Sequence, residues 1–223
     1  MKKLTQKEFN KLKRDEEGYL VIPAFMDLAV IKVFPELCSF GEECSFGRWC
    51  RFGELCKFGE ECSFGELCSF GEECSFGREC SFGELCSFGE VCSFGEVCSF
   101  GRECSFGERC RFGRDCKFGE RCSFCKECSF GEVCSFGREC SFGERCKVTK
   151  KVIINYKCVD RVGKSNRMLY CWHLEDGIYF QAGCFFGSKK ELLKRVNKEY
   201  PKKSEYHLAI NFLTKFINHE KTN

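Results

Sequence analysis

The sequence predicts an all-β solenoid followed by a small α+β module. Phenylalanine occupies every sixth position from Phe40 to Phe142, which makes eighteen hexads without a slip, and glycine follows each ring except that of Phe124. Cysteine stands four residues after each ring, so the repeating unit is F-G-x-x-C-x. After Gly163 this repeat is lost and the composition changes. A short fixed period over half of a chain is typical of repeat architectures.

The repeat resembles the hexapeptide motif of left-handed parallel β-helices, in which a large apolar residue, Gly, two variable residues, a small residue and a further variable residue recur. The resemblance covers Cys38 to about Lys147. It implies triangular coils of 18 residues, three hexads to a coil, and six full turns. The chain departs from the family pattern by placing Phe where Ile, Val or Leu is usual.

The physical interpretation of the hexad assigns a role to each position. A short strand directs one ring inward, a residue free to adopt positive φ turns the corner, and the next strand begins. A single hexad cannot bury its own ring, so stability comes from stacked neighbours. The repeat cysteines are then small hydrophobic groups packed beside the rings, with reduced thiols.

One local departure suggests different chemistry. Cys122, Cys125 and Cys128 form C-x2-C-x2-C, a spacing that can hold a metal or a redox pair. The structural interpretation is favoured: Cys122 and Cys128 are inward repeat members, and Cys125 replaces a glycine at a corner. No cofactor is expected.

Four segments are expected along the chain. Residues 1–18 form a polar N-terminal lead, and residues 19–36 form a degenerate capping coil, because Ile22, Leu28 and Phe34 share the phase of Phe40. Residues 37–162 form the β-helix, and residues 163–223 form the α+β module. Terminal repeats are usually atypical because they must close the open end of the stack.

The module is expected to contain a β-hairpin and two helices. The alternating segments "RMLYCWHL" and "IYFQAGCFF" flank "EDG", a hairpin signal. Ser188 and Glu191 form a capping-box pattern for a first helix, and residues 205–218 follow helical spacing. The stretch "GIYFQAGCFFGSKKELLKRV" resembles the C-terminal module of uncharacterised hexapeptide-repeat proteins of gut bacteria and their phages, a likeness that implies architecture alone.

Coils of 18 residues place particular outward side chains in columns. Glu43, Glu61 and Glu79 form an acidic column, and Trp49, Leu67 and Leu85 form an apolar column that is a candidate interface. Residues 37–100 carry a net charge of −8, whereas residues 148–223 carry +8.

These observations predict a non-enzymatic structural or interaction protein: a rigid rod that presents surface columns, with the module as a recognition element. An alternative is an acidic nucleic-acid mimic that inhibits a basic binding protein, such as a phage counter-defence factor. A hexapeptide acyltransferase is disfavoured, because His173, His207 and His219 all lie outside the hexads.

The expected setting follows from the same features. The absence of an apolar membrane span and the many thiols predict a cytoplasmic protein that does not enter a membrane. The protein partner cannot be named from the sequence, and homo-oligomers through the apolar side of the rod are one option. Direct nucleic-acid binding is not expected of the rod but remains open for the basic module.

Overall fold

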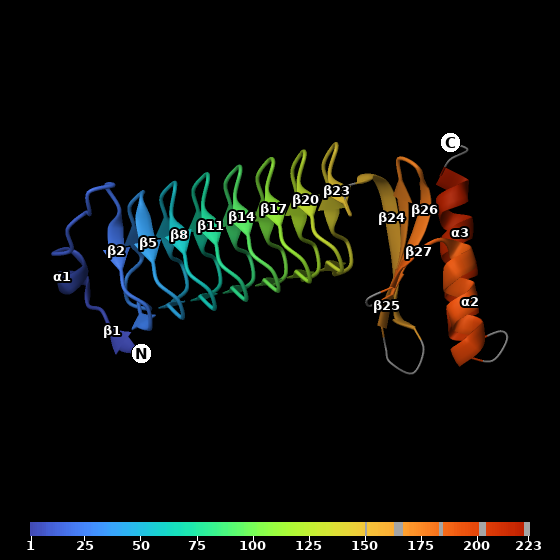
Figure 1. Ribbon diagram of the computed structural model, residues 1–223, viewed down its shortest axis with the longest axis horizontal. Helices are drawn as coiled ribbons and strands as arrows, with labels where there is room; N and C mark the ends of the chain where they lie inside the picture. The colour runs from blue at the N-terminus through green and yellow to red at the C-terminus, as the bar shows by residue number, and fades with distance from the viewer. Residues whose placement is uncertain (150, 163–166, 183–184, 201–203, 221–223) are drawn as a thin grey trace. The chain divides into compact units, whose positions relative to one another are not determined.

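The computed structural model describes residues 1–149, 151–162, 167–182, 185–200 and 204–220, which divide into two compact units, Met1–Thr149 and Lys150–Asn223. The first unit is a parallel β-helix whose coils follow one another from the N-terminus (Figure 1). The predicted class, a left-handed parallel β-helix of 18-residue coils with a small α+β module, is confirmed.

Short strands build the β-helix, most of them two residues long. They are β1 (Lys2–Lys3), β2 (Leu20–Ile22), β3 (Met26–Asp27), β4 (Val33–Phe34), β5 (Cys38–Phe40), β6 (Ser45–Phe46), β7 (Arg51–Phe52), β8 (Lys57–Phe58), β9 (Ser63–Phe64), β10 (Ser69–Phe70), β11 (Ser75–Phe76), β12 (Ser81–Phe82), β13 (Ser87–Phe88), β14 (Ser93–Phe94), β15 (Ser99–Phe100), β16 (Ser105–Phe106), β17 (Arg111–Phe112), β18 (Lys117–Phe118), β19 (Ser123–Phe124), β20 (Ser129–Phe130), β21 (Ser135–Phe136), β22 (Ser141–Phe142) and β23 (Lys147–Val148).

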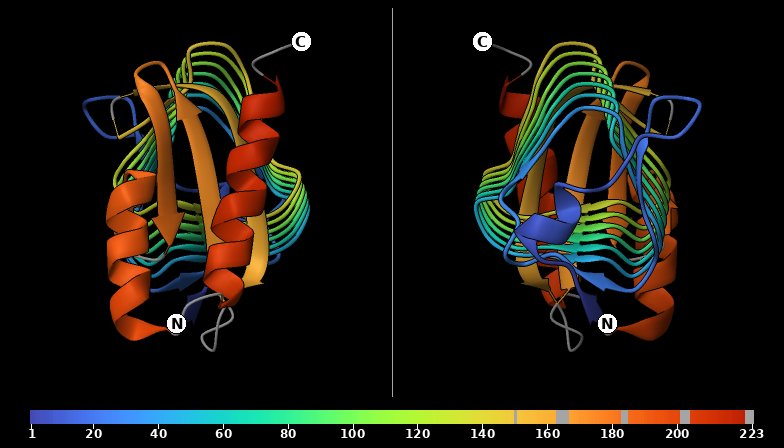
Figure 2. Two further views of the ribbon diagram at one scale, coloured as in Figure 1. Left: turned by 90° about the vertical axis from the view of Figure 1, so that its right-hand side faces the viewer. Right: turned by 90° about the vertical axis from the view of Figure 1, so that its left-hand side faces the viewer.

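Three parallel sheets run along the described part of this unit, one for each side of the coil. Their strand orders are β1-β3-β6-β9-β12-β15-β18-β21, β4-β7-β10-β13-β16-β19-β22 and β2-β5-β8-β11-β14-β17-β20-β23. Paired residues are 18 apart, as in Phe70 with Phe88. Figure 2, which looks along the stack, shows successive coils superimposed around a common interior.

The interior is filled by phenylalanine rings in a herringbone arrangement. Rings 18 residues apart are parallel: Phe64 and Phe82 have centroids 4.8 Å apart and planes only 2° apart. Rings six residues apart meet edge to face, as Phe64 and Phe70 do at 5.1 Å and 86°. Both arrangements suit the quadrupole of an aromatic ring. Three rings per coil therefore fit the interior without overfilling it.

The corner conformation differs from a simple glycine turn. The residue with positive φ is the third after each ring, such as Glu43 at 52° and Trp49 at 63°, whereas no repeat glycine has positive φ. The backbone N–H of this corner residue donates to the next coil, as Leu55 N does to Glu72 O at 2.9 Å. The interchain bond holds a left-handed conformation that side chains other than glycine otherwise disfavour.

The repeat glycines serve a different purpose, which is the close approach of neighbouring coils. A Cβ on Gly71 would lie 2.7 Å from the backbone nitrogen of Glu54 and 2.8 Å from the carbonyl carbon of Gly53. No side chain fits between backbones at this distance. Glycine is therefore required by coil spacing and not by its φ angle.

The N-terminal segment closes one end of the ring stack. Helix α1 (Gln6–Phe9) begins with a capping box formed by Thr5 and Glu8 and buries Phe9. The Phe9 ring meets the Phe34 ring edge to face at 5.4 Å. Ile22 and Phe34 are buried in register with Phe40 and Phe52, so the degenerate coil continues the core.

The second unit is an antiparallel sheet with two helices on one face. Strands β24 (Lys151–Val162), β25 (Arg167–Leu174), β26 (Gly177–Ala182) and β27 (Phe185–Gly187) pair in sequence order. Helices α2 (Lys189–Glu199) and α3 (Glu205–Glu220) follow. Leu192, Val196, Ile210 and Leu213 from the helices share a core with Leu169, Cys171 and Phe180 from the sheet.

The module contains the expected hairpin, β25 with β26, and the Ser188–Glu191 capping box. It also contains more sheet than expected. Residues 151–162, assigned above to the end of the repeat segment, form β24 and pair antiparallel with β25. The expected boundary at 162/163 borders residues 163–166, which lie outside the described residues. Long-range pairing with β25, which no hexad signals, determines where β24 belongs.

Replacing Gly71 with alanine should destabilise the β-helix, because the new Cβ would overlap the backbone of the preceding coil. Overpacking of this kind costs about 1–3 kcal/mol. Cys125 already carries a side chain at the equivalent position, so Cys125→Gly should leave the free energy of unfolding unchanged or raise it. Urea unfolding followed by circular dichroism measures both variants. A Gly71→Ala protein as stable as the native chain would contradict this role of glycine.

Candidate interaction surfaces

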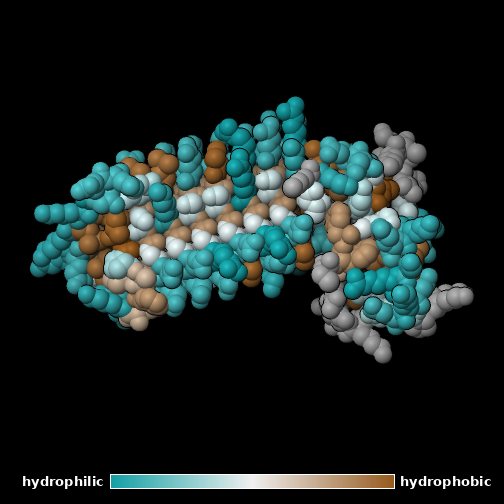
Figure 3. Space-filling view, viewed as in Figure 1, coloured by the Kyte–Doolittle hydropathy of each residue, from teal (hydrophilic) through white to brown (hydrophobic). Residues whose placement is uncertain are grey.

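Each corner of the β-helix projects two successive side chains, at the second and third positions after the ring. Because the pattern repeats by translation from coil to coil, every such position generates a column whose members are 18 residues apart and about 4.8 Å apart along the stack. The faces between the corners carry small outward residues, mostly serine. Figure 3 shows one face as a pale band with hydrophilic side chains along both edges.

The predicted apolar residues do stand in one column. Trp49 is 63% exposed and Leu85 is 46% exposed, whereas Leu67 between them is half-buried. Val30 and Val33, 66% and 63% exposed, lie in the preceding coil on either side of Ile31, which occupies the same column as Trp49 but is buried. We call Val30, Val33, Trp49, Leu67 and Leu85 the apolar ridge. The sequence analysis missed the two valines because the degenerate coil lacks the F-G signature.

Farther along, the same column changes to charged residues that pair with one another. Arg121 contacts Glu103 at 3.6 Å and Glu139 at 3.0 Å, one coil away in each direction. These contacts are exposed, so each contributes little to stability. They do remove the repulsion that like charges would produce in this column, and they confine the apolar ridge to the N-terminal coils.

The predicted acidic column, Glu43, Glu61 and Glu79, occupies a second corner, and all three residues have positive φ. Val97 follows in the same column. The adjacent column on this corner is not uniformly acidic, because Arg78 interrupts it and contacts Glu96 at 3.9 Å. The acidic character of this corner is therefore short and partly neutralised.

A longer acidic column lies on the third corner, and the sequence analysis missed it. We call it the glutamate ridge; its members are Glu36, Glu54, Glu72, Glu90 and Glu108. The rings that precede these residues stack at 4.6 to 4.9 Å, which sets the spacing of the column. The signal was available as an 18-residue interval at the second position after the ring. Only the third position was followed into columns.

Like charges at this spacing repel each other. At 4.8 Å in water the Coulomb energy of two carboxylates is about 1 kcal/mol. Arg109 relieves part of the repulsion by contacting Glu90 at 3.0 Å. Among the described ion pairs, none involves Glu36, Glu54 or Glu72. The ridge is thus a run of exposed negative charge, densest in the first coils.

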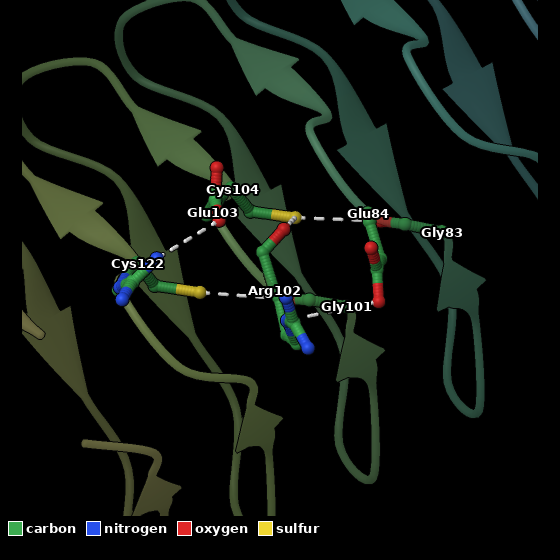
Figure 4. Close-up of polar contacts among 8 residues, drawn as sticks. Gly83, Glu84, Gly101, Arg102, Glu103, Cys104 and Cys122 are labelled. Atoms are coloured by element: carbon green, nitrogen blue, oxygen red, sulfur yellow. Dashed lines mark hydrogen bonds and ion pairs between the residues drawn. The ribbon is translucent and has the colours of Figure 1, made fainter. Parts of the chain in front are cut away.

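The repeat cysteines point inward and are held by the preceding coil. Each thiol donates to a glycine carbonyl 21 residues earlier, as Cys104 does to Gly83 and Cys122 to Gly101, both at 3.4 Å (Figure 4). Hydrogen bonding to the stacked thiols and burial raise the pKa of Cys74, Cys80 and Cys104 above the ordinary thiol value. Neutral, buried thiols of this kind are packing groups and poor nucleophiles.

The C-x2-C-x2-C segment does not form a metal centre in the structure. Cys122 and Cys128 are buried and Cys125 is exposed at a corner. The thiols of Cys122 and Cys128 donate to different carbonyls, those of Gly101 and Gly107. Within the described residues, no group of three or more His, Cys, Asp or Glu side chains is placed to hold a metal ion.

The model of a family described as an RNA-binding, Nab2-type zinc finger matches residues 109–125. These residues form part of the β-helix, including β17, β18 and β19. Cys110, Cys116 and Cys122 begin three different sides of the coil and donate to Gly89, Gly95 and Gly101 respectively. The match therefore follows the regular C-x5-C spacing, and the structure does not converge these thiols on one point.

No curated protein and no solved structure matches the chain. In the described part of the chain, none of the helices has the length and apolar character needed to cross a membrane.

Native protein should resist thiol alkylation at the repeat cysteines, because they are buried in the coil interior. Cys125 should react first, since its side chain is exposed and only modestly desolvated. Mass spectrometry of protein treated with iodoacetamide, with and without urea, counts the modified thiols. Rapid native modification of many repeat cysteines would contradict the packed-thiol interpretation.

Proposed function

We propose that the protein is a non-enzymatic interaction protein, in which a rigid β-helix presents columns of side chains to a macromolecular partner. The observation that carries this proposal is the uninterrupted run of coils on a stacked aromatic core, which fixes corner side chains at regular intervals. The histidines lie in the second unit, away from the coils, so an acyltransferase gains no support from the hexads.

The second unit is proposed as a recognition module. The likeness of residues 177–196 to modules of hexapeptide-repeat proteins from gut bacteria and their phages supports this assignment of architecture. A reducing, cytoplasmic setting is supported by the repeat thiols, which are free and buried in the structure.

Self-association through the apolar ridge is the first interaction that we propose. Exposed apolar side chains that adjoin one another commonly mark an interface, and Trp49 is the kind of residue that dominates interface energies. The ridge lies along a straight corner, so a second copy could align with it over several coils.

Leu85→Asp should lower the mass measured by light scattering and leave the β-rich circular dichroism spectrum unchanged. Leu85 is 46% exposed at a corner with positive φ, a conformation that Asp tolerates. Val97→Asp is the matched control, because Val97 has the same conformation and 41% exposure on a different corner. Equal masses for the native chain and Leu85→Asp, or equal losses in both variants, would contradict association through this ridge.

A second candidate function is imitation of a nucleic-acid backbone, and the glutamate ridge favours it. Regularly spaced carboxylates on a rigid support offer a basic binding protein a line of negative charge in place of phosphates. The column repels itself, so a cationic partner that covers it would stabilise the coils. Inhibition of a basic protein, with phage counter-defence as one setting, follows as the alternative function.

Glu72→Gln should raise the melting temperature slightly and weaken binding to immobilised poly-L-lysine, because it removes one repelling carboxylate from the ridge. Glu103→Gln is the control, since Glu103 pairs with Arg121 at 3.6 Å. Its loss should not raise stability. Differential scanning fluorimetry and a salt series on the resin measure the two effects. A substantially destabilised Glu72→Gln protein would show that the ridge is structural.

A further inference from the structure

Helix α2 lines a shallow groove on the second unit. The groove has a volume of about 630 Å³ and is lined by Lys189, Lys190, Leu193, Lys194 and Asn197. Leu193 is partly buried against the core of the unit and forms the apolar floor. The lysines and Asn197 bring polar groups to the groove that can only donate, or are oriented to donate, hydrogen bonds.

The charge of the groove is largely uncompensated. Neither Lys190 nor Lys194 has an ion-pair partner among the described residues, and the described pair on α2 joins Arg195 to Glu199. Lys189 contacts an uncharged group, the Oδ1 atom of Asn211 on α3, at 3.4 Å. Three ammonium groups in one concavity attract an anion with several charges.

Asn197 is held in one orientation by a short hydrogen-bonded chain. Its Oδ1 lies 2.8 Å from Nε2 of His207, and Nδ1 of His207 lies 2.9 Å from Oγ of Ser204. An amide oxygen only accepts, so Nε2 carries the proton and Nδ1 accepts from the serine hydroxyl. The amide N–H groups of Asn197 are thereby left for a ligand, which must be a hydrogen-bond acceptor.

Beside the groove, α3 exposes apolar side chains. Phe212 follows Asn211 directly and is 56% exposed, and Leu208 is 66% exposed one turn earlier. α2 and α3 cover the same face of the sheet, and contacts from Lys189 to Asn211 and from Asn197 to His207 join them. An exposed ring next to a cationic groove is the combination used to stack bases while the backbone is neutralised.

We propose that the α2–α3 face binds single-stranded nucleic acid, with phosphates in the lysine groove and a base stacked on Phe212. The net charge of +8 on residues 148–223 adds long-range attraction. An acidic protein segment would also meet the lysines. The set of donors without an acceptor in the groove, and a flat ring at its edge, favour phosphates and bases. This proposal does not depend on the role assigned to the β-helix.

The test measures binding of a fluorescently labelled 20-nucleotide oligothymidylate to the full-length chain by anisotropy. If Lys189, Lys190 and Lys194 each neutralise one phosphate, log K should fall against log salt with a slope of about −2. Affinity should then drop about twenty-fold between 50 and 200 mM salt. Absence of binding at 50 mM salt would overturn the proposal.

Matched variants localise the site. The double variant Lys190→Ala/Lys194→Ala should reduce the slope to about −0.7, whereas Lys198→Ala, on the same helix but outside the lining, should change it little. Circular dichroism confirms that each variant is folded. Equal losses in the double variant and in Lys198→Ala would place the binding elsewhere and overturn the assignment.

Phe212 distinguishes bases from an apolar protein surface. Phe212→Leu retains apolar area but removes the flat ring, so affinity should fall at least about five-fold, whereas Phe212→Tyr should bind like the native chain. Competition with poly-L-glutamate of matched charge is the second criterion. If the polypeptide competes as well as unlabelled oligothymidylate, or if Phe212→Leu binds normally, the groove accepts acidic protein and the nucleic-acid assignment fails.

Discussion

The packing of phenylalanine rings sets the dimensions on which the rest of the β-helix depends. Parallel rings in successive coils are separated by 4.6 to 5.2 Å, and rings of adjacent sides meet edge to face. The parallel contacts match the spacing that hydrogen-bonded strands require. Ring stacking and backbone pairing therefore specify the same translation. A residue of different shape at this position would satisfy one of them less well.

That translation accounts for the other invariant positions of the hexad. Glycine follows the ring because a neighbouring backbone passes within 2.9 Å of the place where a Cβ would stand, as at Gly71. Cysteine fits four residues after the ring because a small thiol fills the remaining space and donates to a carbonyl of the preceding coil, as Cys104 does. The polar atom of the thiol is satisfied inside the core, where an unpaired donor would be costly.

The same translation organises the surface, because each corner position recurs one coil later. Charged residues in such columns either alternate in sign, as around Arg121, or repel one another, as in the glutamate ridge. The repeat itself is indifferent to these side chains, which are exposed and leave the coil core unchanged. Differences between columns therefore cannot be explained by folding alone. They point to contacts with other molecules, and the lysine groove of the second unit has the opposite charge.

The sequence by itself determined the coil length, the inward residues and the columns, because a strict six-residue period with three sides leaves only arithmetic between a residue and its neighbour 18 positions later. Trp49, Leu67 and Leu85 could be aligned in this way before any coordinates were considered. The glutamate ridge was equally accessible, although another position of the hexad had to be followed.

Tertiary structure decided what depends on contacts between distant segments or on local backbone geometry. The positive φ at Glu43 and its equivalents is held by hydrogen bonds to the next coil, so residue propensity gave no indication of it. The cap formed by Phe9, the pairing of β24 with β25 and the hydrogen-bonded orientation of Asn197 each join residues that no short period relates. Their placement follows from packing and pairing across the chain, which a one-dimensional pattern does not encode.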